Sequence, residues 1–103
     1  MPNICKAKLE RGYLILRNEG EEDLRVSRIE IEYSIIGFMW EPTTHGKEAK
    51  RVRRVIHEIL AVSKTLPKGG ELRLYFGEVE ELRRLRIFVA KGGKEYVYDC
   101  KVE

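Results

Sequence analysis

The sequence has no glutamine and only two asparagines and two aspartates among its 103 residues. Its polar character comes instead from fifteen glutamates and from twenty lysines and arginines. Few thermolabile amides, combined with many glutamates, lysines and arginines, are typical of proteins from hyperthermophiles. We therefore expect a hyperthermophilic source. The net charge is only +3, which argues against a general binder of polyanions.

Long apolar runs are also absent. No stretch approaches the roughly 20 apolar residues that a helix needs to span a bilayer. The first residues do not form a charged start followed by an apolar run, which is the pattern of a secretory leader. We expect a soluble, cytoplasmic chain, with a cell-surface location as the alternative if a leader or anchor has been removed. A length of 103 residues indicates a single domain over 1–103.

Patterns that carry catalysis or bind metals and cofactors are missing. His45 and His57 are the only histidines, and neither belongs to the closely spaced ligand pairs of a zinc site. The serines lack the strand–turn–helix context of a nucleophile. The Gly69-Gly70 and Gly92-Gly93 pairs lack the Lys-Ser or Lys-Thr of a phosphate-binding loop. We predict a protein that is not an enzyme, with no catalytic residue, no cofactor and no metal.

Apolar and polar residues alternate in the first part of the chain, which predicts an antiparallel hairpin. The alternating segment runs from Asn3 to Leu9, and Arg11-Gly12 suits a two-residue turn. A register with the apolar side chains on one face pairs Cys5, Ala7 and Leu9 with Asn18, Leu16 and Leu14.

The long strand that follows changes its pattern partway. Leu24 and Val26 occupy even positions, whereas the apolar residues from Ile29 to Ile35 occupy odd ones. A regular strand cannot make this change without turning its core face outward. We therefore predict a β-bulge or bend at Ser27-Arg28.

The C-terminal part contains the clearest hairpin pattern. Gly92-Gly93 forms a two-residue turn between Lys91 and Lys94. The implied core pairs are Leu85–Cys100, Ile87–Tyr98 and Val89–Tyr96, and the implied outer pairs are Phe88–Val97 and Arg86–Asp99. Opposite charges face each other in the last of these pairs, so the register is self-consistent.

Two cysteines, Cys5 and Cys100, lie near the two ends of the sequence. Two buried thiols are the default interpretation, since free cysteine is among the most buried residue types. A disulfide is the alternative, because intracellular proteins of hyperthermophiles form such bonds. It requires the first and last strands to be neighbours.

The segment from Lys47 to Leu66 fits two structures. Its apolar residues fall at helical spacing, opposite a largely cationic face, whereas Val55-Ile56 and Ile59-Leu60 are doublets that break a strand pattern. We favour a helix over 47–63, covering the apolar run at Ile35–Trp40. The predicted fold is mainly β, an antiparallel sandwich of six to seven strands with this one helix. The alternative is an α+β fold, in which the helix packs on an antiparallel sheet.

Three stretches carry a resemblance to a known family: LILRNEG followed by LRVSRIEIEY, then TLPKGGELRLYF, then LRIFVAKGGKEYVYDCKV. They contain an Asn-x-Gly loop at Asn18–Gly20, a Leu-Pro-x-Gly entry at Leu66–Gly69 and the closing Gly-Gly hairpin. Together they resemble the immunoglobulin-like sandwiches of archaeal surface proteins, namely archaellin- and pilin-type ectodomains and their accessory proteins. The resemblance implies an immunoglobulin-like fold and an interaction module, and it implies no catalytic residue. The chain departs from this family by lacking a hydrophobic N-terminal helix and by its basic central segment.

Alternation is lost at Ile35–Trp40, where both faces become apolar. Tryptophan and other aromatic residues are favoured anchors of protein interfaces. We therefore predict that Ile36, Phe38, Met39 and Trp40 bind a protein partner or a second copy of the chain. The alternative is that they plug one end of the sandwich or pack under the helix, because the sole tryptophan of a small domain is usually mostly buried.

Cations gather in the sequence Lys47–Arg54. A helix would place Lys47, Lys50, Arg51 and Arg54 on one face. Together with Arg53, these residues would contact the phosphates of a nucleic acid, which is the second functional hypothesis. The run itself contains no aromatic residue for base stacking. The alternative is a solvated charged face with no partner.

Overall fold

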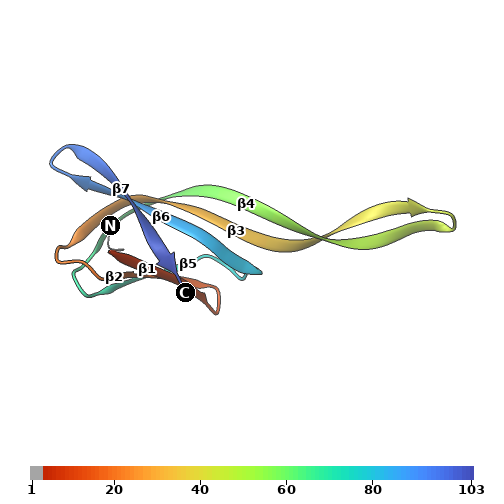
Figure 1. Cartoon of the computed structure of the whole chain (residues 1–103), viewed down its shortest axis with the longest axis horizontal. Helices are drawn as coiled ribbons and strands as arrows, with labels where there is room; N and C mark the ends of the chain where they lie inside the picture. The colour runs from red at the N-terminus through yellow and green to blue at the C-terminus, as the bar shows by residue number, and fades with distance from the viewer. Residues whose placement is uncertain (1–3) are drawn as a thin grey trace.

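The computed structural model describes residues 4–103 (Figure 1). This part of the chain contains seven β-strands and no helix. The strands are β1 (Cys5–Glu10), β2 (Tyr13–Asn18), β3 (Leu24–Thr43), β4 (Gly46–Leu66), β5 (Glu71–Tyr75), β6 (Glu81–Lys91) and β7 (Lys94–Val102). The prediction of a mainly β fold is confirmed, since strands account for 78% of the structure. The expected start of the first strand at Asn3 lies outside the described residues.

The strands form one curled sheet in the order β4-β3-β6-β7-β1-β2-β5. Neighbouring strands are antiparallel except β1 and β7, which run parallel, so the prediction of a purely antiparallel sheet is wrong at this junction. The junction is narrow, because only Lys6–Lys101 and Ala7–Val102 pair across it. It joins a three-stranded group, β1-β2-β5, to a four-stranded group, β4-β3-β6-β7.

The hydrophobic core contains side chains from both groups of strands. Fully buried members include Ala7, Leu14 and Leu16 from the first group and Val26, Ile29, Ile31, Leu85 and Ile87 from the second. The curl of the sheet brings these apolar faces into one cluster. Burying each large aliphatic side chain stabilises the fold by about 1.5–3 kcal/mol. The core therefore holds together two groups of strands that share few hydrogen bonds.

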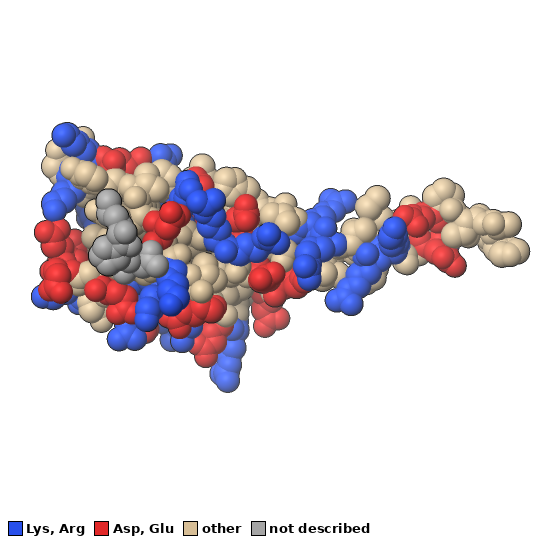
Figure 2. All heavy atoms as spheres, in the orientation of Figure 1, with Lys and Arg blue, Asp and Glu red and all other residues tan. Residues whose placement is uncertain are grey.

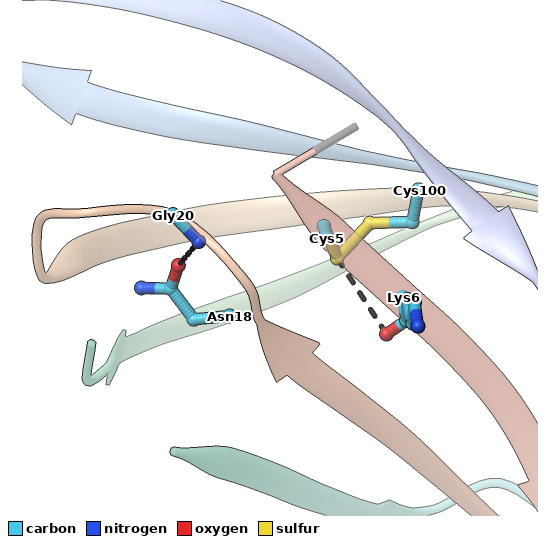
Figure 3. The surroundings of a disulfide bond; sticks show 5 residues. All are labelled: Cys5, Lys6, Asn18, Gly20 and Cys100. Atoms are coloured by element: carbon cyan, nitrogen blue, oxygen red, sulfur yellow. Dashed lines mark hydrogen bonds between the residues drawn. A yellow bond between two sulfur atoms is a disulfide. The ribbon is translucent and has the colours of Figure 1, made fainter. Parts of the chain in front are cut away.

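A disulfide joins Cys5 in β1 to Cys100 in β7 (Figure 3). Their Cα atoms lie 4.5 Å apart, and both side chains are buried in the core. The dashed line from Cys5 Sγ to the Lys6 carbonyl oxygen, 3.7 Å long, marks a contact, because a disulfide sulfur has no hydrogen to donate. The interpretation of two free thiols is wrong. The first and last strands are neighbours, as the disulfide requires, and the bond reinforces their narrow junction.

Both predicted hairpin registers are confirmed. β1 pairs with β2 through Cys5–Asn18, Ala7–Leu16 and Leu9–Leu14, and β6 pairs with β7 through Leu85–Cys100, Ile87–Tyr98 and Val89–Tyr96. The outer pair Arg86–Asp99 forms an ion pair of 2.9 Å. The pairing of β3 with both of its neighbours shifts between Val26 and Arg28, which confirms the predicted bulge.

The prediction of a helix over 47–63 is wrong, because these residues belong to β4, which pairs with β3 along its length. The apolar doublets explain the error. Ile56 and Leu60 pack against the core, whereas Val55 and Ile59 point outward and are 53% and 57% exposed. One member of each doublet faces solvent, so the residues at helical spacing do not form a single buried face. The α+β alternative, which needs this helix, is wrong for the same reason.

β3 and β4 extend beyond the rest of the sheet as a two-stranded arm, which we define as residues 35–54. β6 pairs with β3 only as far as Ser34–Glu81, so the arm begins where this pairing stops. Figure 2 shows the arm as a narrow projection from the rest of the molecule, which we call the body. The molecule measures 63 × 26 × 25 Å, with a radius of gyration of 17.4 Å. A compact domain of this length has a radius of gyration of about 13 Å.

Asn18 is a fully buried polar residue that links separate segments of the body. Its Nδ2 donates hydrogen bonds to the carbonyl oxygens of Glu22 at 2.7 Å and Leu66 at 3.1 Å. Its Oδ1 accepts a hydrogen bond of 2.9 Å from the Gly20 N–H (Figure 3). The loop after β2 is thereby tied to the end of β4.

We expect the Asn18→Ala substitution to lower the free energy of unfolding by about 2–4 kcal/mol, because it removes three hydrogen bonds and leaves the buried Leu66 carbonyl oxygen without this partner. Chemical denaturation followed by circular dichroism measures the change. The Asn18→Asp variant keeps the acceptor for Gly20 but loses both donors and buries a charge, so its loss is expected to be at least as large. An alanine variant as stable as the original chain would show that these hydrogen bonds do not hold the two segments together.

Candidate docking arm

The arm consists of residues 35–43 of β3 paired with residues 46–54 of β4. At about 3.4 Å per residue it extends about 30 Å from the body. The tip is a tight turn at Thr44-His45, closed by a hydrogen bond of 3.2 Å from Thr43 Oγ1 to the Gly46 carbonyl oxygen. Gly46 has a φ of 129°, which side chains disfavour, so glycine suits this position. Within the part of the chain that the structure describes, no third strand pairs with the arm.

Side chains alternate between the two faces of the arm. One of them, which we call the aromatic face, carries Ile36, Phe38 and Trp40 from β3. Phe38 is 71% exposed and Trp40 is 70% exposed, whereas Ile36 is half-buried. Met39, 46% exposed, lies on the opposite face. The structure therefore brings together three of the four predicted partner-binding residues and separates Met39. The interpretation that this segment plugs a sandwich is wrong for Phe38 and Trp40.

The cations of the arm come from β4, and a strand distributes them differently from a helix. The register with β3 places Lys47, Arg51 and Arg53 on the aromatic face, where Arg51 lies directly opposite Phe38. Lys50 and Arg54 lie on the opposite face. The predicted grouping of Lys47, Lys50, Arg51 and Arg54 on one face is therefore wrong. Figure 2 shows basic side chains gathered along the arm between the body and its tip.

Two of these cations are paired within the chain. The Arg53 guanidinium binds both carboxylate oxygens of Glu80, with Nε 3.1 Å from Oε2. The Lys50 Nζ lies 3.2 Å from Glu41 Oε1. Among residues 4–103, no ion pair involves Lys47, Arg51 or Arg54. These three remain available to an acidic partner.

Tyr33 anchors the base of the arm to the body. Its ring packs edge-on against Phe76, with ring centroids 5.0 Å apart. Burial raises the pKa of the Tyr33 phenol, and the nearby Glu58 carboxylate raises the pKa further. The phenol therefore stays neutral, and its ring is buried where the arm joins the body. Within a few residues of Tyr33 the sheet narrows to β3 and β4, because no third strand of residues 4–103 pairs with them beyond Ser34.

An exposed hairpin of this kind is not stable by itself. Two-stranded hairpins are marginally stable at best in water, and they need further strands or a packed face. The molecule exposes 7284 Å² of surface. A compact monomer of the same mass exposes about 6,000 Å², so the excess is about 1,300 Å². This excess is comparable to the area that a specific protein interface buries.

The aromatic face continues onto the outer face of the body. Ser34 pairs with Val55 and Glu30 pairs with Ile59, so the exposed Val55 and Ile59 lie on the same side of the hairpin as Phe38. This extension was not predicted from the sequence, because the helical spacing places both residues on the buried side of a helix. The doublets Val55-Ile56 and Ile59-Leu60 could have indicated it, since a strand with one buried face exposes one member of each doublet.

A groove of about 520 Å³ lies near the base of the arm. Its lining is apolar at Leu9, Val79, Leu82 and Val102 and charged at Glu80, Glu81, Arg83 and Glu103. The groove was not predicted from the sequence, because its lining residues come from separate parts of the chain. The acidic run Glu78–Glu81 was the only local signal.

Other candidate sites have little geometric support. Among residues 4–103, no group of three or more histidine, cysteine, aspartate or glutamate side chains is placed to hold a metal ion. His57 Nε2 lies 3.2 Å from Glu30 Oε1 on the outer face, and His45 lies in the turn of the arm. The described residues contain no helix of the length and apolar character needed to cross a membrane. No protein family, curated protein or solved structure was found to match this chain.

Proposed function

We propose that this protein is a non-catalytic interaction module that docks a protein partner, or a second copy of itself, through its arm. The observation that carries the proposal is the exposure of Phe38 and Trp40, at 71% and 70%, on a hairpin that extends beyond the body. Large aromatic residues supply most of the binding energy in many protein interfaces. Contiguous exposed apolar patches often mark sites of interaction.

We also propose that the body is an immunoglobulin-like sandwich related to the archaeal surface domains. Two observations support this fold: the division of the strands into two groups and the single core that both groups share. The buried disulfide fits a protein that works at the cell surface, and it also fits the cytoplasm of a hyperthermophile. In either setting the sandwich would serve as a rigid base from which the arm projects.

The proposal is tested with a Phe38→Ser/Trp40→Ser variant. The matched control is Tyr75→Ser, which removes an aromatic side chain of the body that is 74% exposed. Sedimentation velocity measures self-association, and quantitative co-purification from cell extract measures binding to other proteins. We expect the arm variant alone to lose association while keeping its fold. A chain that is monomeric at all concentrations, with the same co-purifying proteins in both variants, would overturn the proposal.

A second candidate function is nucleic-acid binding. It is favoured by one finding, which is that Lys47, Arg51 and Arg53 lie on the same face as Phe38 and Trp40. Cations that bind phosphates, combined with aromatic rings that stack on bases, form the usual surface for single strands. A two-stranded ribbon also fits the major groove of DNA. The Arg53–Glu80 pair weakens this candidate, because it removes one cation from the set.

Fluorescence anisotropy with labelled duplex DNA and single-stranded RNA at low salt tests this candidate. We expect binding that weakens as salt rises, because phosphate contacts release counterions. The charge-reversal variant Arg51→Glu/Arg53→Glu/Arg54→Glu would abolish it. No detectable binding of either nucleic acid at low salt would remove the candidate.

A further inference from the structure

We propose that the occupant of the arm is a second copy of this chain, and that the two copies form a two-fold dimer. In this dimer, the arm of each copy places Trp40 and Phe38 in the groove at the base of the other copy's arm. The inference rests on the proposed docking function and names the partner for it.

The groove has the size and lining to receive aromatic side chains. Its volume of about 520 Å³ falls within the range of about 300–1,000 Å³ that encloses small molecules. Leu9, Val79 and Val102 line it and are only half-buried in the isolated chain. An indole ring placed against them would remove apolar surface of both copies from water. Aromatic side chains bury about 150–250 Å² each, more than other residue types.

The charges of the arm and of the groove are complementary. Within residues 4–103, neither Glu81 nor Glu103 of the groove forms an ion pair, and Arg83 of the groove lies 3.5 Å from Glu32. Lys47 and Arg51 of the arm also form no ion pair within these residues, and both lie on the aromatic face with Trp40. Complementary charges of this kind set the orientation of a complex and suppress wrong partners. The carboxylates would repel a nucleic acid.

The position of the groove allows both contacts to form at once. Glu81, which lines the groove, pairs with Ser34, the last residue of β3 before the arm begins. Figure 1 shows β6 starting at the end of the body from which the arm emerges. Two copies lying side by side with antiparallel arms would therefore place each arm tip at the base of the other arm. Such a contact uses the same surface on both copies, which is the defining property of a two-fold interface.

The available area is sufficient for a stable dimer. Each copy exposes about 1,300 Å² more than a compact monomer of its mass. Two copies together therefore have about 2,600 Å² to cover, and standard interfaces bury about 1,200–2,000 Å² in total. The dimer can form even if part of each arm remains in water.

The test uses one variant of the arm and one of the groove. Trp40→Ala removes the anchor, and Val79→Glu places a further carboxylate on the half-buried floor of the groove. Met39→Ala, on the opposite face of the arm, is the matched control. We expect Trp40→Ala and Val79→Glu each to weaken every tip-to-groove contact at least about 30-fold. Because the dimer has two such contacts, its dissociation constant is expected to rise about 1,000-fold. Sedimentation equilibrium measures the dissociation constants.

Mixing the two defective chains separates docking from misfolding. The Val79→Glu chain keeps an intact arm, and the Trp40→Ala chain keeps an intact groove. A heterodimer of the two therefore contains one intact tip-to-groove contact. We expect the mixture to recover association, with heterodimers tighter than either homodimer. A variant that is defective because it is unfolded would not be rescued in this way. Circular dichroism of each chain alone confirms that its strands are intact.

The outcomes distinguish this inference from the proposed function. A monomeric original chain would overturn the dimer, and the proposed function would still stand if the Phe38→Ser/Trp40→Ser variant lost another protein partner. A dimer that Val79→Glu leaves unchanged, or variants that mixing does not rescue, would overturn the docking of the arm in the groove. Rescue on mixing, together with an unchanged Met39→Ala control, supports it.

Discussion

Removing the disulfide between Cys5 and Cys100 is expected to lower the free energy of unfolding by about 4–5 kcal/mol. The bond closes a loop with a sequence separation of 95 residues, so it excludes a large share of the conformations of the unfolded chain. The expected loss is a large fraction of the total stability of a small domain, which is about 5–15 kcal/mol.

The position of the disulfide adds a structural reason for a large effect. β1 and β7 form two residue pairs, and their junction connects the two groups of strands. Without the covalent bond, this junction depends on few hydrogen bonds and on the shared core. We therefore expect the group β1-β2-β5 to separate from the remaining strands before the rest of the molecule unfolds.

The Cys5→Ala/Cys100→Ala variant and the reduced original chain are the two forms to compare with the oxidised chain. Thermal unfolding is expected to show a fall in midpoint of roughly 20–30 °C in both forms. Hydrogen exchange is expected to show that amides of β1, β2 and β5 lose protection first. Oxidised and reduced chains that unfold within about 1 kcal/mol of each other would contradict this account of the junction.

Shortening the arm is expected to give a folded chain that no longer associates. The change replaces residues 37–52 with an Asn-Gly turn, which joins antiparallel strands directly. It keeps the Ile36–Arg53 pair and the ion pair of Arg53 with Glu80. None of the residues in the core cluster lies between 37 and 52. We therefore expect the stability of the body to change by less than about 1 kcal/mol.

Association is expected to weaken at least about 1,000-fold in the shortened chain, because both contacts of the dimer lose Phe38 and Trp40 together. Sedimentation equilibrium and chemical denaturation measure the two properties separately. An unfolded shortened chain would show that the arm is part of the folding unit. A shortened chain that associates as strongly as the original would place the interface elsewhere on the body.

Much of the sheet could be predicted because its signals are local. The alternation of apolar residues, with Gly12 and Gly92-Gly93 at the turns, fixed the register of both hairpins. The bulge near Ser27 was predictable for the same reason. When the apolar residues change from even to odd positions, a strand needs a bulge or bend to keep them on one face. Local patterns do not determine which strands distant in sequence pair with each other. The parallel pairing of β1 with β7 therefore could not be predicted from them.

The arm was predicted only in part. The loss of alternation at Ile35–Trp40 correctly drew attention to this segment, but a helix was expected to cover it. β4 is a strand because it pairs with β3, and such pairing overrides local helical spacing. Ser34 shows the same limitation. It occupies an even position among apolar residues at odd positions, which is a solvent-facing position in a regular strand, yet it is fully buried where the arm leaves the body. Its carbonyl oxygen accepts a hydrogen bond of 3.0 Å from the Glu80 N–H.

The fluorescence of Trp40 tests the central claim most directly, because Trp40 is the only tryptophan and it lies near the tip of the arm. Emission and quenching by acrylamide are measured over a range of protein concentrations, alongside sedimentation. We predict that the emission shifts to shorter wavelength and becomes protected from acrylamide as the dimer forms, and that Val79→Glu prevents both changes. A Trp40 that remains as accessible to acrylamide in the associated protein as in the monomer would contradict the claim that the arm is a docking element.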